Sequence, residues 1–290
     1  MDTLPTPNEP TGGVEPLGPI NAAPLIEVVE RHLLQLLRGL RPEDWDKPTA
    51  APGWTVRDVT CHLLDTELRK LSLARDRHAP ERPDIRSNED LVAFIDSLNA
   101  AGVASYRGLS APVLISLMEV ASAESARYHS HLDPLALAAF AVSWAGEDSS
   151  PNWFDTAREL TERWHHQQQI RDAVGRPGIM TRELYGPVVD CFMRALPYHY
   201  RSVGASRGSL AVFSVSGDAG GRWYLHRGPE AWALVARETG RRVSETTIPQ
   251  EIAWRIFTKG IDREAARELV TVVGDAAIGL HVLGMLAIVG

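Results

Sequence analysis

The stretch Arg158 to Arg171, RELTERWHHQQQIR, predicts one uninterrupted helix that carries a carboxylate and an imidazole on one face. Glu162 and His166 are four residues apart, which on an α-helix separates their directions by only about 40° and their heights by about one turn. Both side chains can therefore converge on one point, and a divalent metal ion is one candidate for that point. Most acid and histidine pairs at this spacing are surface ion pairs, so a metal site needs a third ligand from elsewhere in the chain.

The composition is that of a globular chain with no affinity for polyanions. Its 290 residues are 44% apolar and 23% charged, which suits one large domain or two modest ones, and we expect two. The net charge is −7, the pI is about 5.8, and Lys and Arg are scattered, which argues against nucleic acid and anionic membranes as partners. Only Cys61 and Cys191 occur, so we expect neither a disulfide framework nor a Cys-x-x-Cys zinc site, and we expect a reducing cytoplasm.

The N-terminal segment has a composition of its own. Residues 1–20 hold five prolines and little that could form a buried face, which predicts an extended or disordered arm. The segment is acidic rather than basic and then apolar, so we expect neither a signal peptide nor an anchor. No apolar run approaches the roughly 20 residues that span a bilayer. These features predict a soluble, intracellular protein.

Residues 21–178 are predicted to be helical almost throughout. Apolar residues recur at three- and four-residue steps over 21–39, 55–77, 88–106 and 110–131, and the central helix spans 152–174. Thr55 and Asp58 form a capping-box-like start for the second of these helices, and the central helix ends at Gly175. Long amphipathic helices with polar connections predict an antiparallel four-helix bundle, whose facing helices can supply metal ligands.

His62 is the most informative residue of the predicted second helix. It lies on the apolar stripe, so it should face other helices and should need a polar partner. A core histidine satisfied by a carbonyl or hydroxyl group is the alternative to a metal ligand. Cys61 points about 100° away from His62 and cannot easily pair with it as a nucleophile. Asp65 and Glu67 are expected in solvent or around the ligands rather than as ligands.

Residues 179–290 predict a smaller α+β domain. A helix is expected at 181–201, and SLAVFSVSG and GRWYLHRG alternate apolar and polar positions on either side of a glycine-rich turn, which predicts a strand-turn-strand unit. A third strand AWALVA, helices at 248–258 and 263–268, a strand LVTVVG and a closing helix at 275–289 follow. No GxGxxG or Walker pattern is present, so no nucleotide site is predicted.

Three segments carry a family resemblance, namely Asp44–Asp76, Ala157–Gly175 and Trp254–Asp275. The first contains the motif W-x-x-x-D-x-x-x-H (Trp54, Asp58, His62), and the second contains E-x-x-x-H (Glu162, His166). Together they resemble the mycothiol-dependent maleylpyruvate isomerase family over nearly the whole chain after residue 20. The resemblance implies a DinB-like metal-binding four-helix bundle over 21–178, followed by a sterol-carrier-like α+β domain over 179–290.

The resemblance also implies a metal site and a thiol cofactor. In the family a histidine of the second helix and a later Glu-x-x-x-His pair hold one divalent metal, so the metal ligands implied here are His62, Glu162 and His166. Zinc is the usual ion and nickel an alternative. Three protein ligands leave a position open on zinc, where a thiol or water can be activated. The implied activity is isomerisation or S-transfer on a small electrophilic substrate, with mycothiol or another low-molecular-weight thiol as cofactor.

Several residues around the implied site leave alternatives open. His165 is the spare ligand if the helix register differs. Gln167, Gln168 and Gln169 follow His166 where many relatives carry an acidic residue, and a carboxylate would orient a ligand histidine more strongly than an amide. The family's isomerases also use an arginine of the C-terminal domain, for which this chain offers four candidates: Arg222, Arg227, Arg255 and Arg267.

The alternative function is a non-catalytic module that retains the bundle fold and binds a small molecule or lipid. In that case the apolar closing helix would line a hydrophobic pocket together with aromatic residues of the second domain. Trp223, Tyr224 and Trp232 are the aromatic candidates, and we favour an ordinary core role for them. A small-molecule substrate and a thiol are the expected partners of the enzyme, and a homodimer is left open.

Overall fold

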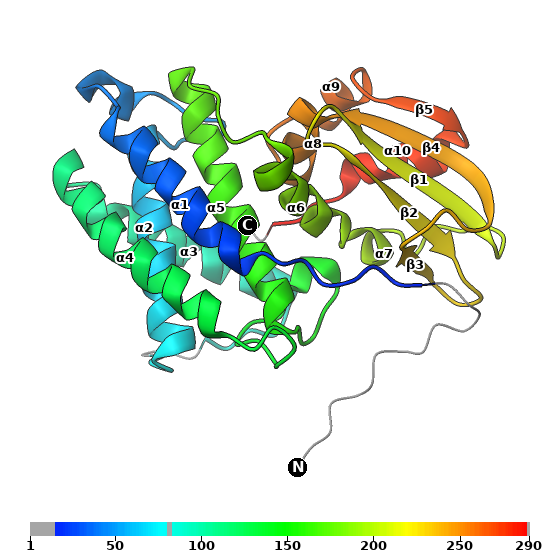
Figure 1. Cartoon of the computed structure of the whole chain (residues 1–290), viewed down its shortest axis with the longest axis horizontal. Helices are drawn as coiled ribbons and strands as arrows, with labels where there is room; N and C mark the ends of the chain where they lie inside the picture. The colour runs from blue at the N-terminus through cyan, green and yellow to red at the C-terminus, as the bar shows by residue number, and fades with distance from the viewer. Residues whose placement is uncertain (1–14, 80–82, 289–290) are drawn as a thin grey trace, which may run out of the picture. The chain divides into compact units, whose positions relative to one another are not determined.

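The computed structural model describes residues 15–79 and 83–288, and their contacts group into two units. Ile20–Phe192 form a helical unit, and Met193–Leu286 with residues 15–19 form a unit built on a sheet (Figure 1). This confirms the predicted α plus α+β fold class. The contacts divide the chain at 192/193, whereas the sequence analysis places the boundary at 178/179.

The helical unit contains long helices (Figure 1). The helices are α1 (Ala23–Arg38), α2 (Val56–Lys70), α3 (Asn88–Tyr106), α4 (Ala111–His131), α5 (Asn152–Val174) and α6 (Arg182–Met193). The connections between them, apart from the tight turn between α3 and α4, are extended loops. Two 3-10 turns, Pro42–Asp46 and Ser143–Ala145, lie in the connections, and the second helix continues as a π-helical segment, Leu71–Arg75.

Local sequence signals place the ends of α2 and α5. The Thr55 hydroxyl accepts a hydrogen bond from the Asp58 backbone N–H, and the Asp58 carboxylate accepts one from the Thr55 backbone N–H at 3.0 Å. This is the predicted capping box, and it satisfies two backbone donors that the first turn would otherwise leave unpaired. Gly175 ends α5 with φ 65°, a left-handed conformation that glycine adopts without a steric penalty.

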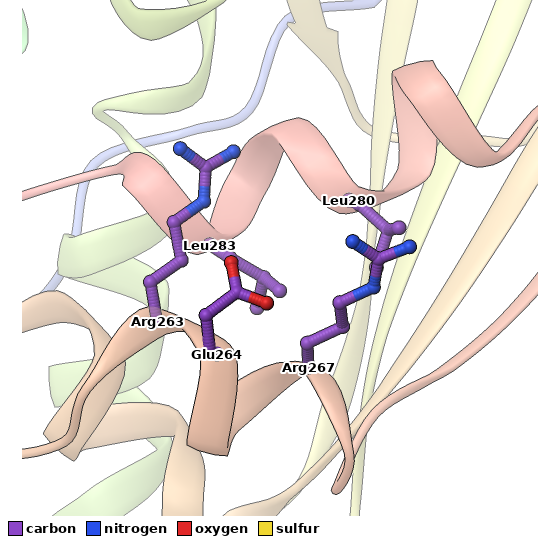
Figure 2. A pocket seen from close by; sticks show the side chains of 5 residues that line it. All are labelled: Arg263, Glu264, Arg267, Leu280 and Leu283. Atoms are coloured by element: carbon purple, nitrogen blue, oxygen red, sulfur yellow. The ribbon is translucent and has the colours of Figure 1, made fainter.

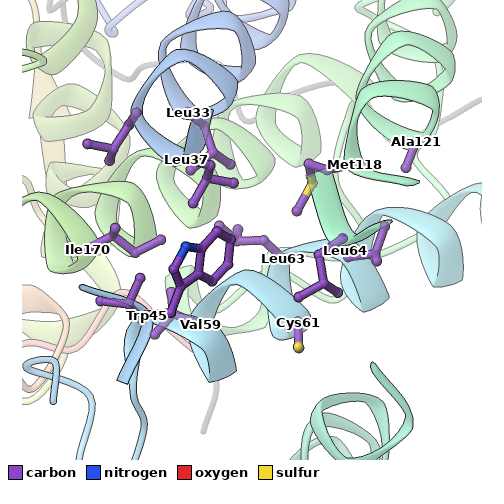
Figure 3. Packing of buried hydrophobic residues seen from close by; sticks show 13 residues of the cluster. Leu33, Leu37, Trp45, Val59, Cys61, Leu63, Leu64, Met118, Ala121 and Ile170 are labelled. Atoms are coloured by element: carbon purple, nitrogen blue, oxygen red, sulfur yellow. The ribbon is translucent and has the colours of Figure 1, made fainter. Parts of the chain in front are cut away.

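Four helices surround the main hydrophobic core of this unit (Figure 3). Helices α1, α2, α4 and α5 all contribute to it, and α3 packs on α2. The core residues are Leu33, Leu36, Leu37, Trp45, Val56, Val59, Cys61, Leu63, Leu64, Leu114, Met118, Ala121 and Ile170. Burial of these side chains holds α2 and α5 side by side, which is the arrangement that a metal site shared between them requires.

The second unit is a mixed five-stranded sheet of order β3-β2-β1-β4-β5. Strand β1 lies at its centre, antiparallel to β2 and parallel to β4, so that Phe213 is opposite Trp223 on one side and Thr246 on the other. The strands are β1 (Ser209–Ser216), β2 (Gly221–Arg227), β3 (Trp232–Val235), β4 (Arg241–Pro249) and β5 (Thr271–Gly274). The helices are α7 (Leu196–His199), α8 (Gln250–Phe257), α9 (Arg263–Arg267) and α10 (Ala276–His281).

The C-terminal part of the chain departs from the sequence prediction in four places. Strand β4 was not predicted, and the helix expected from 248 begins only at Gln250. The helix expected over 181–201 divides into α6 and α7, and the closing helix expected over 275–289 stops at His281 before a short 3-10 turn. Two of the three inward side chains of β4 are the hydroxyl residues Ser244 and Thr246, so its hydropathy does not alternate clearly.

The described part of the N-terminal segment contacts the sheet unit. Pro16 forms an isolated antiparallel bridge with Val235, and the backbone N–H of Ala236 donates to the carbonyl of Glu15 at 2.8 Å. The rest of the predicted arm, residues 1–14, lies outside the described residues. Among the helices that the structure describes, none combines the length and apolarity needed to cross a bilayer.

Candidate metal centre

Helices α2 and α5 run antiparallel and bring the three expected ligands together. Lys70 contacts Asp155 at one end of the pair, and the rings of His62 and His166 lie 4.7 Å apart further along it. His62 therefore faces the turn of α5 that carries Glu162 and His166. One potential ligand atom from each of the three side chains lies within 4.8 Å of the other two, a spacing that suits a shared cation.

The protonation states of the cluster suit a metal ion. Burial, followed by the neighbouring His166, holds the pKa of His62 well below its ordinary value, so His62 is neutral. Burial alone would raise the pKa of Glu162, but the hydrogen bond with His166 and the nearby histidines and Arg158 lower it to about 2. At neutral pH the cluster thus offers one carboxylate and unprotonated imidazole nitrogen, which are the forms that bind metal.

Two further observations fit a metal here. The Nδ1 atom of His62 is buried and has no hydrogen-bond partner among the described residues, although its side chain is 5% exposed overall. A buried ring nitrogen without a partner is costly unless an ion or water completes its bonding. The Nδ1 of His166 lies 2.9 Å from the amide oxygen of Gln169, an arrangement that holds the ring with its Nε2 facing Glu162, whose Oε2 lies 3.6 Å away.

The structure separates the expected ligands from their neighbours. His165 is buried with its Nδ1 2.9 Å from the backbone carbonyl of Thr161, and it is not part of the three-residue cluster. Burial raises the pKa of Cys61 to about 11, so its thiol is not a nucleophile at neutral pH. Of the two neighbouring acids, which were expected in solvent or around the ligands, Asp65 is partly buried and pairs with Arg69, and Glu67 is fully buried rather than in solvent; neither belongs to the three-residue cluster.

Trp54 covers one side of the cluster. Its ring centroid lies 4.9 Å from that of His62 and 6.4 Å from that of His166, nearly parallel to the latter. The indole is partly exposed, and the Glu162 side chain is 29% exposed. The cluster is therefore sheltered by an aromatic ring but still reaches solvent through Glu162, as a site that exchanges small ligands requires.

A second group of polar residues, which we name the charge network, lies within the same bundle. Arg163 is at its centre: its Nε lies 2.7 Å from Glu30, and its Nη1 lies 2.8 Å from Glu159. Lys70 is 2.6 Å from Asp155 and 3.3 Å from Glu159. The network comprises Glu30, Glu67, Lys70, Ser122, Ser125, Asp155, Arg158, Glu159 and Arg163, and of these only Arg158 is not fully buried.

The charge network would carry a net negative charge if all of its groups were ionised. Four carboxylates, those of Glu30, Glu67, Asp155 and Glu159, meet three cations, those of Lys70, Arg158 and Arg163. Burial, followed by the adjacent Glu30, raises the pKa of Glu67 well above its ordinary value. The Ser122 hydroxyl lies within hydrogen-bond reach of both carboxylates, at 3.0 Å and 3.2 Å. Glu67 therefore keeps its proton to a higher pH than an ordinary carboxyl group.

The charge network was not predicted from the sequence, because its members are charged and polar residue types that usually lie on the solvent-exposed faces of helices. The available signal was Glu30, which lies between Ile26, Val29 and Leu33 on the buried face of α1. A charged residue in the middle of an apolar stripe is unlike the usual solvated face of a helix. It indicates a buried partner, which in this case is Arg163.

The arginine and tryptophan candidates of the sheet unit lie in different environments. Arg222 pairs with Glu245 at 2.9 Å, while Arg267 lines a small cavity between α9 and α10 with Arg263, Glu264, Leu280 and Leu283 (Figure 2). Trp223 and Trp232 are buried in the core of the unit, and the indole N–H of Trp232 donates to the carbonyl of Val203. This agrees with the core role favoured for the two tryptophans.

The fold and the cluster define a class: a helical bundle with a His, Glu and His cluster between two antiparallel helices, followed by a mixed α+β unit. Comparison with known proteins gives the family. The family model of the mycothiol maleylpyruvate isomerase N-terminal domain matches residues 27–171, half of the chain, and the chain belongs to this family. The match contains all three candidate ligands, and it confirms the resemblance found in the sequence.

Solved structures agree at the level of the fold. The chain is similar to the crystal structure of a histidine-to-alanine mutant of the mycothiol-dependent maleylpyruvate isomerase, with a TM-score of 0.54 and 13% identity over 90% of this chain and 95% of that one. A second crystal structure of the mycothiol-dependent maleylpyruvate isomerase matches with a TM-score of 0.50 and 13% identity over 83% and 88% of the two chains. No protein of curated function matches the chain.

Proposed function

We propose that this protein is a metal-dependent enzyme of the maleylpyruvate isomerase type, which uses a small-molecule thiol to isomerise a small electrophilic substrate. The observation that carries the proposal is the convergence of His62, Glu162 and His166 within 4.8 Å, inside the segment that matches the family model. Mycothiol or another low-molecular-weight thiol is the proposed cofactor. Zinc is the favoured ion, with nickel as the alternative.

The protein supplies the ligands and their orientation. His62 presents a neutral imidazole, Gln169 orients the ring of His166, and Glu162 presents a carboxylate that stays ionised down to a pH of about 2. Two neutral ligands and one anionic ligand leave net positive charge on a divalent ion and at least one open position. A bound divalent metal supplies the positive charge that lowers the pKa of a thiol and makes the thiolate available near neutral pH.

Thiol catalysis of a cis–trans isomerisation balances without an oxidant or reductant. The thiolate adds to a carbon–carbon double bond conjugated with a carbonyl group, so that a C–S bond forms and the π electrons move onto the carbonyl oxygen. Rotation about the resulting single bond follows. The electrons then return, the C–S bond breaks, and the thiolate leaves unchanged. S-transfer onto the electrophile is the related outcome in which the adduct takes up a proton instead of eliminating the thiol.

The test is thiol-dependent isomerisation by zinc-loaded protein purified without an affinity tag. We expect maleylpyruvate to be isomerised in the presence of mycothiol and not in its absence, and we expect activity to be lost in His62→Ala and Glu162→Ala. His165→Ala is the matched control and should retain the activity, because this histidine points to the Thr161 carbonyl. Zinc-loaded protein that binds the thiol but leaves electrophiles unchanged would instead favour the non-catalytic binding module.

A further inference from the structure

Beyond the three ligands, α2 places a cation beside the candidate metal centre. His62, Asp65 and Arg69 follow one another at intervals of three and four residues, so they share one face of the helix. The Nη2 of Arg69 lies 2.7 Å from the Asp65 carboxylate. Helical side chains lean toward the N-terminus, so this guanidinium reaches back from its own turn toward His62.

The position of Arg69 is fixed by a close packing of α2 against α3. Arg69 Nη2 also donates to the Asn99 side-chain oxygen at 3.0 Å. The partner carboxylate, Asp65, lies against Gly102 so closely that a Cβ at this glycine would be 2.2 Å from the Asp65 Cγ. Glycine at 102 therefore lets Asp65 approach the backbone of α3 and hold the arginine in place.

Arg69 keeps hydrogen-bond donors free, unlike Arg158 of α5. Its contacts among the described residues run through Nη2, and its side chain is 21% exposed. Arg158 on α5 is equally accessible at 20%, but its Nε and Nη2 donate to Asp155 and its Nη2 also to Glu159. Two arginines of similar exposure thus differ in pairing, and Arg69 is the one with Nε and Nη1 still available to a ligand.

We propose that Arg69 is a specificity-determining residue that binds a carboxylate of the molecule occupying the metal centre. The inference rests on the proposed function. It specifies that the substrate is an anion, namely a small electrophile that carries at least one carboxylate. A guanidinium suits this task because it is planar, permanently charged and able to donate several N–H groups to one carboxylate. Asp65 and Asn99 hold it in place, and neither is a metal ligand.

The test is calorimetric titration of zinc-loaded protein with fumarate, and with fumaramide as the uncharged analogue of the same shape. We expect wild-type protein to prefer fumarate, and Arg69→Met to bind fumarate about 10- to 100-fold more weakly, the range of one charge-assisted hydrogen bond. Zinc content should be unchanged, since no ligand is altered. Arg69→Lys should lie in between, and Arg31→Met, which removes an exposed arginine of α1, should bind as wild type.

Gly102→Ala provides a second variant in which Arg69 itself is intact. The added methyl group displaces Asp65, so fumarate binding should weaken while zinc is retained. Unchanged fumarate affinity in Arg69→Met, or a wild-type protein that does not distinguish fumarate from fumaramide, would overturn the inference. Titration of metal-free protein tests the role of Arg69 independently of the proposed function. A preference for fumarate that depends on Arg69 in the absence of metal would support the anion site even if the protein does not bind zinc.

Discussion

Removal of the Arg163 guanidinium should destabilise the protein far more than removal of any surface arginine. The Arg163 side chain is 3% exposed and contacts Glu30 at 2.7 Å, Glu159 at 2.8 Å and the Ser125 hydroxyl at 2.8 Å. In Arg163→Met the carboxylates lose this cation but stay buried. Leaving a buried charge unpaired costs about 3–5 kcal/mol. For a chain of this size that is a decrease in Tm of about 6–20 °C.

Chemical unfolding followed by far-ultraviolet circular dichroism measures this loss. The matched control is Arg31→Met, which removes an arginine that is 68% exposed and 3.5 Å from Glu27. Exposed ion pairs of this kind contribute at most about 1 kcal/mol. Equal losses in the two variants would refute the reasoning, because they would mean that the charge network contributes no more than a surface pair.

The pH dependence of Arg163→Met provides an internal check. Burial and the neighbouring Glu30 raise the pKa of Glu67 in the folded protein. A carboxyl group with a raised folded-state pKa contributes its full stability below its unfolded pKa and loses it as the pH rises through the folded pKa. Without Arg163 the buried carboxylates of the charge network repel one another more strongly. The loss of unfolding free energy in Arg163→Met, relative to wild type, should therefore be smaller at pH 5 than at pH 8.

Three further predictions concern single side chains. Glu67→Gln cannot lose a proton, so its stability relative to wild type should rise as the pH increases from 5 to 8; a difference in Tm that does not vary with pH would argue against a raised pKa of Glu67. Titration with Co²⁺ should quench the fluorescence of Trp54, whose ring lies 4.9 Å from that of His62, and Trp54→Phe should remove most of the response; full quenching in that variant would place the ion elsewhere. Gln169→Ala should weaken zinc binding about 10-fold by freeing His166, whereas Gln169→Glu should strengthen it; equal affinities in competition with a chelator would exclude a role for this contact.

The helical part of the fold could be predicted because its helices follow a clear apolar period. The capping box at Thr55 and the glycine at 175 placed the start of α2 and the end of α5, and the structure has both. Strand β4 could not be found in the same way. Its inward positions carry the hydroxyl residues Ser244 and Thr246, and the Thr246 hydroxyl reaches its partner, the Gly279 carbonyl, only once the sheet and α10 are assembled.

The candidate site, like the fold, could be predicted only in part from the sequence. The spacing of Glu162 and His166 follows from helix geometry alone, and the resemblance supplied His62, which the structure places opposite them. The partners around the ligands depend on tertiary packing. Glu67 and Arg69 lie two residues apart on α2, yet one is buried in the charge network while the other contacts α3 and remains partly exposed. No local pattern separates the two, because the difference arises from which helix each side chain faces.

Metal analysis of protein purified without an affinity tag tests whether His62, Glu162 and His166 bind a divalent metal. We predict equimolar zinc or nickel in the wild type, loss of the metal in His62→Ala and Glu162→Ala, and retention of the metal in His165→Ala. Helical content should be preserved in all three variants. Wild-type protein that takes up no divalent metal even after reconstitution, or a His62→Ala variant that keeps a full complement, would contradict it.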